Sequence, residues 1–198
     1  MRLFIALDID DGIRERIARF AEGLQGFAPE ARWVKPESLH VTLKFIGEQP
    51  DEAFEPIKIS LATVESSPPA IHFCGYGFFP TTKSARVFWI GMDAGPELAE
   101  LALKVEDGMA ALGIPKENRA FSPHLTLARS AGGTGSVRGR QDTPARSFQR
   151  LQEKLAAFPP PDFGTMTARE FFLYRSQLSP KGSRYTKLAA FPLSVATG

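Results

Sequence analysis

Two hexapeptides of nearly the same sequence constrain the fold of this chain most strongly. HVTLKF begins at His40 and HLTLAR begins at His124, although the 198 residues include only three histidines. A shift of the sequence against itself by 84 residues, from 40 to 124, superimposes the motifs without gaps and aligns two further pairs, Arg2 with Arg86 and Phe4 with Phe88. We interpret this shared register as an internal duplication.

The elements expected around the two motifs follow the same order. A β-rich segment over 2–9 and an amphipathic helix over 10–24 precede the first motif. A strand over 84–93 and a helix over 95–113 precede the second motif. The repeated order of strand, helix and motif strand favours duplication over chance similarity between two β-rich segments.

Length and composition agree with one globular domain. The chain is long enough to bury a core, and its 43% hydrophobic and 23% charged residues are near the averages for soluble proteins. Two repeats are too few to bury the faces of a solenoid. We predict one domain, residues 1–198, whose repeats of approximately 1–83 and 84–198 pack as two pseudo-symmetric α+β lobes around a shared cleft.

The rest of the chain supplies further expected elements. In chain order these are a strand region over 33–47, a helix over 50–66, a strand over 70–80, a helix over 147–158, and two closing strands within 162–193 around a turn at Ser179 to Ser183. Residues 130–146 are typical of a mobile loop. Its basic residues form either a funnel for RNA or a solvated loop: Arg138, Arg140, Arg146 and the neighbouring Arg150.

Charge and cysteine content limit the partners, the metal sites and the cellular compartment expected for this chain. The net charge of +2 does not demand a nucleic-acid partner but allows a local anion site. Cys74 is the only cysteine, which excludes an intramolecular disulfide and a zinc-binding thiolate cluster. The first apolar run reaches Asp8 and is too short for a secretion signal or a membrane span. We expect the cytoplasm and no membrane association.

The H-x-T pattern suggests chemistry on a phosphoryl group. Residues two apart on a strand share a face, so His40 lies beside Thr42 and His124 beside Thr126. If the two strands face each other, the four side chains surround a volume that suits a tetrahedral anion. Two histidines can then act as general acid and general base, while the threonine hydroxyls donate to phosphoryl oxygens. This scheme requires no metal and no cofactor.

The two motif histidines have two alternative interpretations. A metal site would lack ligands, because each motif offers one imidazole and no matching carboxylate in both copies. Strand histidines with only a structural role are the other alternative, and the paired threonines in both copies argue against it. The third histidine, His72, has no threonine two residues later and is interpreted as structural. Cys74 is interpreted as a small buried or strand-facing residue.

The chain resembles the two-histidine (2H) phosphoesterases, and within them the RNA 2′,3′-cyclic phosphodiesterases that are also described as 2′-5′ RNA ligases. The resemblance covers nearly the whole chain through RLFIALDI, LHVTLKFIGE, FSPHLTLAR and LYRSQLSPKGSRYTKLAAFPL. It implies a bilobal α+β fold with an antiparallel sheet in each lobe and the active site in the groove between them. It also implies metal-independent hydrolysis of a 2′,3′-cyclic phosphate to a 2′-phosphate, with a reverse joining reaction in some members.

The resemblance also implies roles for the two motifs. His40 would protonate the departing 3′ oxygen and His124 would activate water, while Thr42 and Thr126 would hold the phosphate. A symmetric site could exchange the acid and base roles with the direction of the reaction. Arg often lies near substrate at the position of Arg129 in this family. Arg129 follows His124 at an odd offset, so only a bulge or the strand end would turn it inward.

Three more residues are candidates for substrate binding. An aromatic ring can stack on a base and a lysine can meet the RNA backbone, which makes candidates of Phe45, Tyr185 and Lys181. Ordinary packing, or a solvated turn for the lysine, is the alternative reading of each.

The predicted function is hydrolysis of RNA 3′ ends that carry a 2′,3′-cyclic phosphate, with tRNA fragments among the possible substrates, by a monomer. A module that binds RNA ends without turnover is one alternative. Hydrolysis of a small cyclic phosphate, such as an ADP-ribose cyclic phosphate, is the other.

Overall fold

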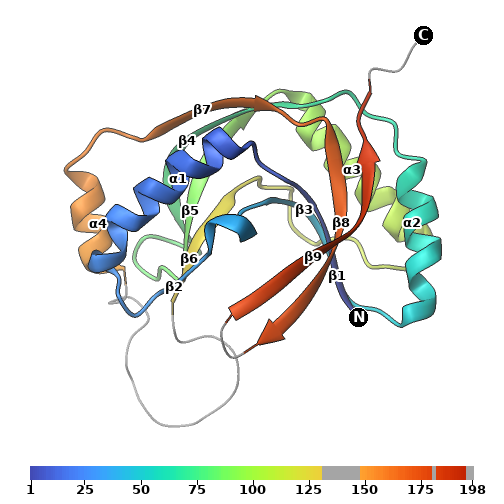
Figure 1. The fold of residues 1–198 in the computed structure, drawn as a ribbon, viewed down its shortest axis with the longest axis horizontal. Coiled ribbons are helices and arrows are strands. Elements are labelled where there is room, and N and C mark those ends of the chain that lie inside the picture. Colours follow the sequence, from blue (N-terminus) through green and yellow to red (C-terminus); the bar gives the residue numbers. More distant parts are fainter. Residues whose placement is uncertain (131–147, 180–181, 195–198) are drawn as a thin grey trace.

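The computed structural model describes residues 1–130, 148–179 and 182–194, and it places their strands in two antiparallel sheets (Figure 1). The first sheet has the order β3-β1-β8-β9, formed by Val41–Glu48, Arg2–Leu7, Glu170–Ser179 and Gly182–Pro192. The second has the order β2-β6-β5-β4-β7, formed by Arg32–Trp33, Leu125–Arg129, Val87–Ala94, Ala70–Phe79 and Asp162–Thr167. The predicted α+β fold with two lobes is confirmed.

The helices lie beside the two sheets. Helix α1 (Asp11–Leu24) contacts β7 of the second sheet, and α4 (Gln149–Ala156) lies at the same end of the molecule. Helices α2 (Phe54–Ala62) and α3 (Pro96–Ala111) pack on each other and on β9 and β3 of the first sheet. Short 3₁₀ helices are η1 (Gln25–Phe27), η2 (Pro36–Ser38) and η3 (Asp51–Ala53).

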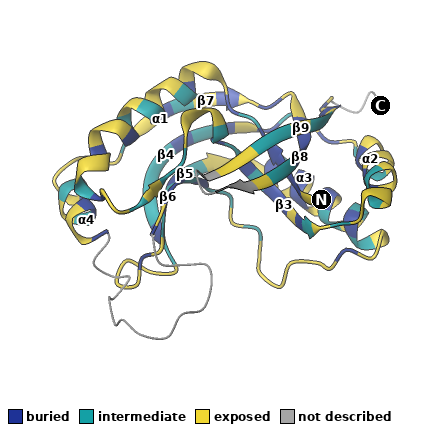
Figure 2. Ribbon diagram, turned by 60° about the horizontal axis from the view of Figure 1, so that its bottom comes forward, coloured by how far each residue is buried: buried dark blue, intermediate teal, exposed yellow. Residues whose placement is uncertain are grey.

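Apolar periodicity explains why these segments are helical. Helix α3 buries one face, at the helical spacing expected from the sequence: Leu98, Leu101, Ala102, Val105 and Met109. Helix α1 buries Ile13, Ile17, Ala21 and Leu24, while its opposite face is exposed (Figure 2). Among the described residues, no helix combines the length and the apolarity that crossing a membrane would require.

The closing segment differs from the sequence prediction. Three strands, not two, follow α4, because residues 162–167 form a separate strand, β7, that pairs with β4 in the second sheet. Strands β8 and β9 form the predicted hairpin in the first sheet. The chain changes sheets at Ala168 and Arg169, whose backbone groups bond to Pro69 and Leu193. Nothing local in the sequence marked this change of sheet.

The two sheets do not coincide with the two halves of the sequence. Strands β2 and β4 from the first half lie in the second sheet, and β8 and β9 from the second half lie in the first. If the two-residue edge strand β2 is set aside, the second sheet has the order β6-β5-β4-β7. It then corresponds to the first sheet, β3-β1-β8-β9, because a motif strand (β3 or β6) lies at one end of each. The duplication with a boundary near residue 84 stays a prediction about the sequence.

The offset of 84 residues does not hold along the whole repeat. Ile5 pairs with Lys44, and Phe88 pairs with Ala128, which is 84 residues beyond Lys44. Ile5, rather than Phe4, is therefore the structural equivalent of Phe88. The gapless match of Phe4 with Phe88 is wrong by one position, and it joined residues on opposite faces of their strands.

The apolar side chains form one large cluster and one small one. The large cluster unites buried residues from both sheets and from the helices. The small cluster lies on the other face of the first sheet and consists of Phe4, Ala6, Phe172 and Tyr174. We call this face of the first sheet, and the face of the second sheet that carries Trp89, the site faces, because the two motifs lie on them.

Candidate active site

Each motif histidine lies at the entrance of a strand rather than within it. His40 directly precedes β3 and His124 directly precedes β6. Val41 and Leu125, the next residues, are completely buried in the core. The threonines follow on the site faces, where Thr42 pairs with Ala6 and Thr126 with Trp89. The expected separation of motif side chains from core side chains is therefore present in both copies.

A backbone carbonyl fixes the orientation of each imidazole. Nδ1 of His40 lies 2.7 Å from the carbonyl oxygen of Ser38, and Nδ1 of His124 lies 2.8 Å from that of Ser122. Since a carbonyl can only accept, Nδ1 carries the proton and donates it. Nε2 is then the nitrogen left for proton transfer in both rings. Sequence reasoning missed this arrangement, although a serine precedes each histidine at the same offset.

Aromatic rings surround the two imidazoles. The ring centre of His40 lies 4.9 Å from that of Phe4 and 5.2 Å from that of Tyr185. The ring of His124 lies 4.9 Å from Phe79 and 6.3 Å from Trp89. These rings limit the rotation of the imidazoles and remove water from them. Of these aromatic residues, only Tyr185 was predicted from the sequence to belong to the site.

A bulge follows the threonine in both motifs. On β3, Thr42 pairs with Ala6 and Lys44 with Ile5, so Leu43 has no partner on β1. On β6, Thr126 pairs with Trp89 and Ala128 with Phe88, so Leu127 has none on β5. One extra residue reverses the alternation of faces beyond it. The residue after it, Lys44 or Ala128, consequently points to the core.

The bulges bring two predicted binding residues to the site faces. Phe45 pairs with Phe4, its ring lies 6.2 Å away, and 55% of its surface is exposed. Arg129 pairs with Val87 at the end of β6 and is exposed. The odd offset of Arg129 from His124 is thus compensated by the bulge. Lys181 and residues 131–147 lie outside the described part of the chain, and Arg150 is exposed on α4.

Burial and the positive charge of Arg129 both lower the pKa of each motif histidine. Desolvation lowers the pKa of His40 and of His124 below the ordinary value of 6.5, and the bonds to the serine carbonyls oppose this only in part. The Arg129 guanidinium lowers both pKa values further, and the charge of His124 also lowers the pKa of His40. Arg129 therefore disfavours the protonated form of both imidazoles.

An acidic residue near His40 is the centre of a charged network. Asp8 accepts hydrogen bonds from Arg14 and, at 2.5 Å, from Lys187. Its charge favours the protonated form of His40 and so raises the pKa of that ring against the effect of burial. Arg14 also donates to the carbonyl oxygens of Pro36 and Leu39, which flank the serine that holds His40. The network therefore positions the first motif.

A cavity of about 420 Å³ opens beside the first motif. His40, Tyr174 and Tyr185 supply its aromatic lining, and its charged lining consists of Asp8, Glu37, Arg184 and Lys187. A larger hollow of about 600 Å³ also borders Asp8 but touches neither motif histidine. We place the site at the smaller cavity because it contains His40. His124 does not line this cavity, and the charge of Arg129 lowers the pKa of both rings.

Two lobes with one histidine-threonine motif each define, by fold and site, a protein of the two-histidine phosphoesterase class. The chain belongs to the LigT like phosphoesterase family, whose model matches residues 7–89 and again residues 90–185.

Individual relatives agree with this assignment. An RNA 2′,3′-cyclic phosphodiesterase of Archaeoglobus fulgidus is 35% identical over 191 residues, covering 96% of this chain and 99% of the relative. The RNA 2′,3′-cyclic phosphodiesterase of Escherichia coli is 30% identical and covers 98% of this chain and 97% of its own length. The crystal structure of E. coli LigT complexed with 3′-AMP has a TM-score of 0.75 at 29% identity over 98% of both chains.

Proposed function

We propose that this chain is an RNA 2′,3′-cyclic phosphodiesterase that produces a 2′-phosphate without using a metal. The observation that carries the proposal is the repeated motif geometry, in which each imidazole donates through Nδ1 to a serine carbonyl and Nε2 has no hydrogen-bond partner among the described residues. The names of the full-length relatives support the same activity.

The proposed mechanism uses one proton transfer at each histidine. Nε2 of His124 accepts a proton from water as the water oxygen attacks phosphorus. The bond between phosphorus and the 3′ oxygen breaks, and Nε2 of His40 gives its proton to that oxygen. The hydroxyls of Thr42 and Thr126 donate to the non-bridging oxygens, where negative charge accumulates. If a 5′-hydroxyl takes the place of water as the nucleophile, the same two proton transfers join that end to the cyclic phosphate in a 2′-5′ linkage and release the 3′ oxygen.

Binding of substrate assists the acid step. The pKa of His40 is lowered in the free protein, which disfavours the protonated form that the acid role requires. A phosphate anion beside the ring has the opposite effect, since an opposite charge within a few ångströms favours imidazolium. Asp8 contributes in the same direction. The substrate therefore helps to protonate the residue that acts on it.

Phe45, Tyr185 and Arg129 are proposed to contact the RNA. The rings of Phe45 and Tyr185 lie on either side of Phe4 at 6.2 and 5.0 Å, near enough to the first motif to stack on a base. Arg129 offers a planar pair of donors for a phosphate. We propose further that the protein acts as a cytoplasmic monomer on RNA ends, including those of tRNA fragments.

An oligonucleotide with a terminal 2′,3′-cyclic phosphate tests the proposal directly. In excess chelator, the protein should convert this end to a 2′-phosphate, which electrophoresis and phosphatase sensitivity identify. A product with a 3′-phosphate, or tight salt-dependent binding without conversion, would overturn the proposal. A rate on a small cyclic phosphate, such as an ADP-ribose cyclic phosphate, far above the rate on the oligonucleotide would instead indicate a nucleotide substrate.

The effect of Arg129 on the two histidines is testable through the pH dependence of the rate. Because both imidazoles have a lowered pKa, kcat/KM of the free enzyme should follow a bell with its maximum below about pH 6.5. The substitution Arg129→Gln removes a positive charge that disfavours imidazolium, so both limbs should move to higher pH. Rates across the pH range at low ionic strength measure the shift. A rate loss with unmoved limbs would show that Arg129 affects substrate binding alone.

A further inference from the structure

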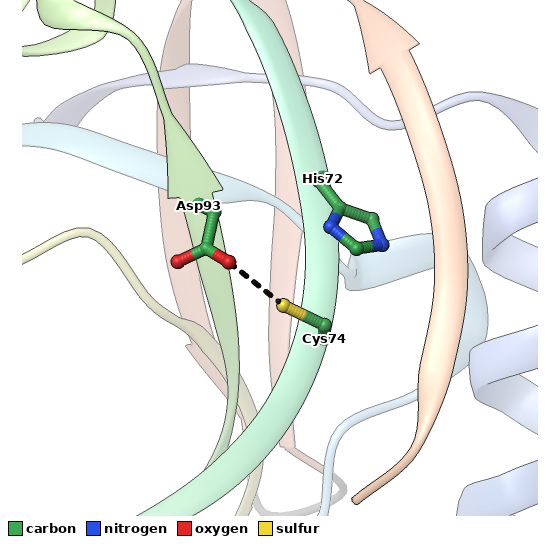
Figure 3. A group of neighbouring side chains, drawn as sticks. All are labelled: His72, Cys74 and Asp93. Atoms are coloured by element: carbon green, nitrogen blue, oxygen red, sulfur yellow. Dashed lines mark hydrogen bonds between the residues drawn. The ribbon is translucent and has the colours of Figure 1, made fainter.

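A cluster of metal-ligating side chains lies on the second sheet, apart from the two motifs. His72 and Cys74 on β4 and Asp93 on β5 place one donor atom each within 4.8 Å of one another (Figure 3). His72 pairs directly with Asp93 across the two strands, and Cys74 follows two residues later. Ile71 and Phe73, between and beside them, are fully buried in the core. The three donors therefore share the opposite face, where solvent has access.

A fourth residue holds the histidine in a ligand orientation. Asp162 on β7 lies 3.0 Å from Nε2 of His72, and the backbone N–H of Gly164 donates to the same carboxylate oxygen at 2.9 Å. A carboxylate partner at Nε2 makes that nitrogen the donor and leaves the lone pair on Nδ1. Figure 3 shows Nδ1 on the side of the ring that faces Cys74 and Asp93. Carboxylates hold metal-binding histidines in this way.

The spacing of the donors is close to that of a coordinated set. Ligands about 2.0 to 2.3 Å from a tetrahedral ion lie roughly 3.3 to 3.8 Å apart. Sγ of Cys74 is already 3.3 Å from a carboxylate oxygen of Asp93, to which its thiol donates. All three donor atoms lie within 4.8 Å of one another, so a bound ion would have to draw only the wider pairs together. Backbone pairing between β4 and β5 fixes the Cα positions from which the three side chains extend.

The mixture of donors selects the kind of ion. Thiolate sulfur and imidazole nitrogen favour borderline ions such as Zn²⁺ over Mg²⁺ and Ca²⁺, which prefer oxygen ligands. We propose that His72, Cys74 and Asp93 bind a Zn²⁺-like divalent cation, with water in the fourth position and Asp162 orienting His72. Coordination replaces the S–H bond of Cys74 with a bond from sulfur to metal and releases the proton to solvent.

This proposal is independent of the proposed function. The proposed ligands include the third histidine and the single cysteine, and neither residue belongs to the H-x-T motifs. A single cysteine excludes a thiolate cluster, which needs several cysteines, but it is enough for a mixed set of sulfur, nitrogen and oxygen ligands. His72 and Asp93 lie on consecutive strands and become neighbours only through the register in which β4 pairs with β5, so motif spacing gave no sign of the set.

Cobalt binding provides a direct test, because a Co²⁺–thiolate bond produces a charge-transfer band in the near ultraviolet. The metal-free full chain should develop this band up to one equivalent of Co²⁺, and Zn²⁺ should abolish it. Since Cys74 is the only cysteine, its rate of reaction with a chromogenic disulfide should fall at least tenfold on saturation with Zn²⁺. Absence of the band at one equivalent would overturn the proposal.

Variants separate this site from other metal-binding groups. Cys74→Ser should abolish the cobalt band, and Asp162→Asn should weaken Zn²⁺ affinity by about 10- to 100-fold while leaving all three ligands in place. Glu55→Gln, which alters an exposed carboxylate on α2, should leave the affinity unchanged. The band should persist in a variant with both His40→Ala and His124→Ala. Loss of the band in that double variant, with its circular dichroism unchanged, would contradict the assignment.

Discussion

Replacing His124 by Ala is expected to lower kcat for cyclic-phosphate hydrolysis by about 10²- to 10⁴-fold, and replacing His40 by Ala should have an effect of the same size. Under the proposed mechanism, each substitution removes the group that carries one of the two proton transfers while the other imidazole stays in place. Single-turnover rates with a 2′,3′-cyclic phosphate oligonucleotide measure the loss without interference from product release.

The pH dependence distinguishes a catalytic loss from a structural one. Each variant should lose the limb of the bell that its histidine contributes, while the other limb remains. The double variant should be little slower than either single one, because residues that act as a unit are not additive. A histidine variant that keeps both limbs and loses less than about tenfold in rate would contradict a role in proton transfer.

Replacing Glu106 by Ala is expected to lower the free energy of unfolding by about 3 kcal/mol. The side chain of Lys44 is 1% exposed, and its ammonium group donates to Glu106 at 2.6 Å and to the carbonyl oxygen of Pro115 at 2.9 Å. Without the carboxylate, the buried charge has only a carbonyl partner. Urea denaturation monitored by circular dichroism measures the change.

A neighbouring ion pair provides a matched control. Asp107 follows Glu106 on α3 and accepts from Lys116 at 2.5 Å, but both side chains are 56% exposed. Asp107→Ala should leave stability unchanged within error, since solvent screens the exposed pair. Combining Lys44→Met with Glu106→Leu should recover most of the loss, because no unpaired charge remains. Equal destabilisation by Glu106→Ala and Asp107→Ala would show that burial does not control the effect.

Lys44 shows how a local reading of the sequence can fail. It follows Leu43 in the motif strand, and lysine is rarely fully buried without a partner. The bulge at Leu43 turns Lys44 toward the core, where Glu106 on α3 and the segment at Pro115 meet it. The same type of bulge at Leu127 turns Ala128 inward and Arg129 outward. The sequence does not reveal either bulge, because an unpaired residue exists only relative to a partner strand.

The sequence by itself determined the two H-x-T motifs, the α+β class, the main strands and helices, and the separation of His40 and Thr42 from the buried Val41. These depend on periodicity and on alternation along one strand, which are local properties. Only the tertiary structure decided that β4 and β8 exchange sheets, that the repeats differ by one residue at Phe4 and Phe88, and that His72 lies beside Asp93. Strand partners and register are selected by the packing of distant side chains, so they become definite only when the whole core has assembled.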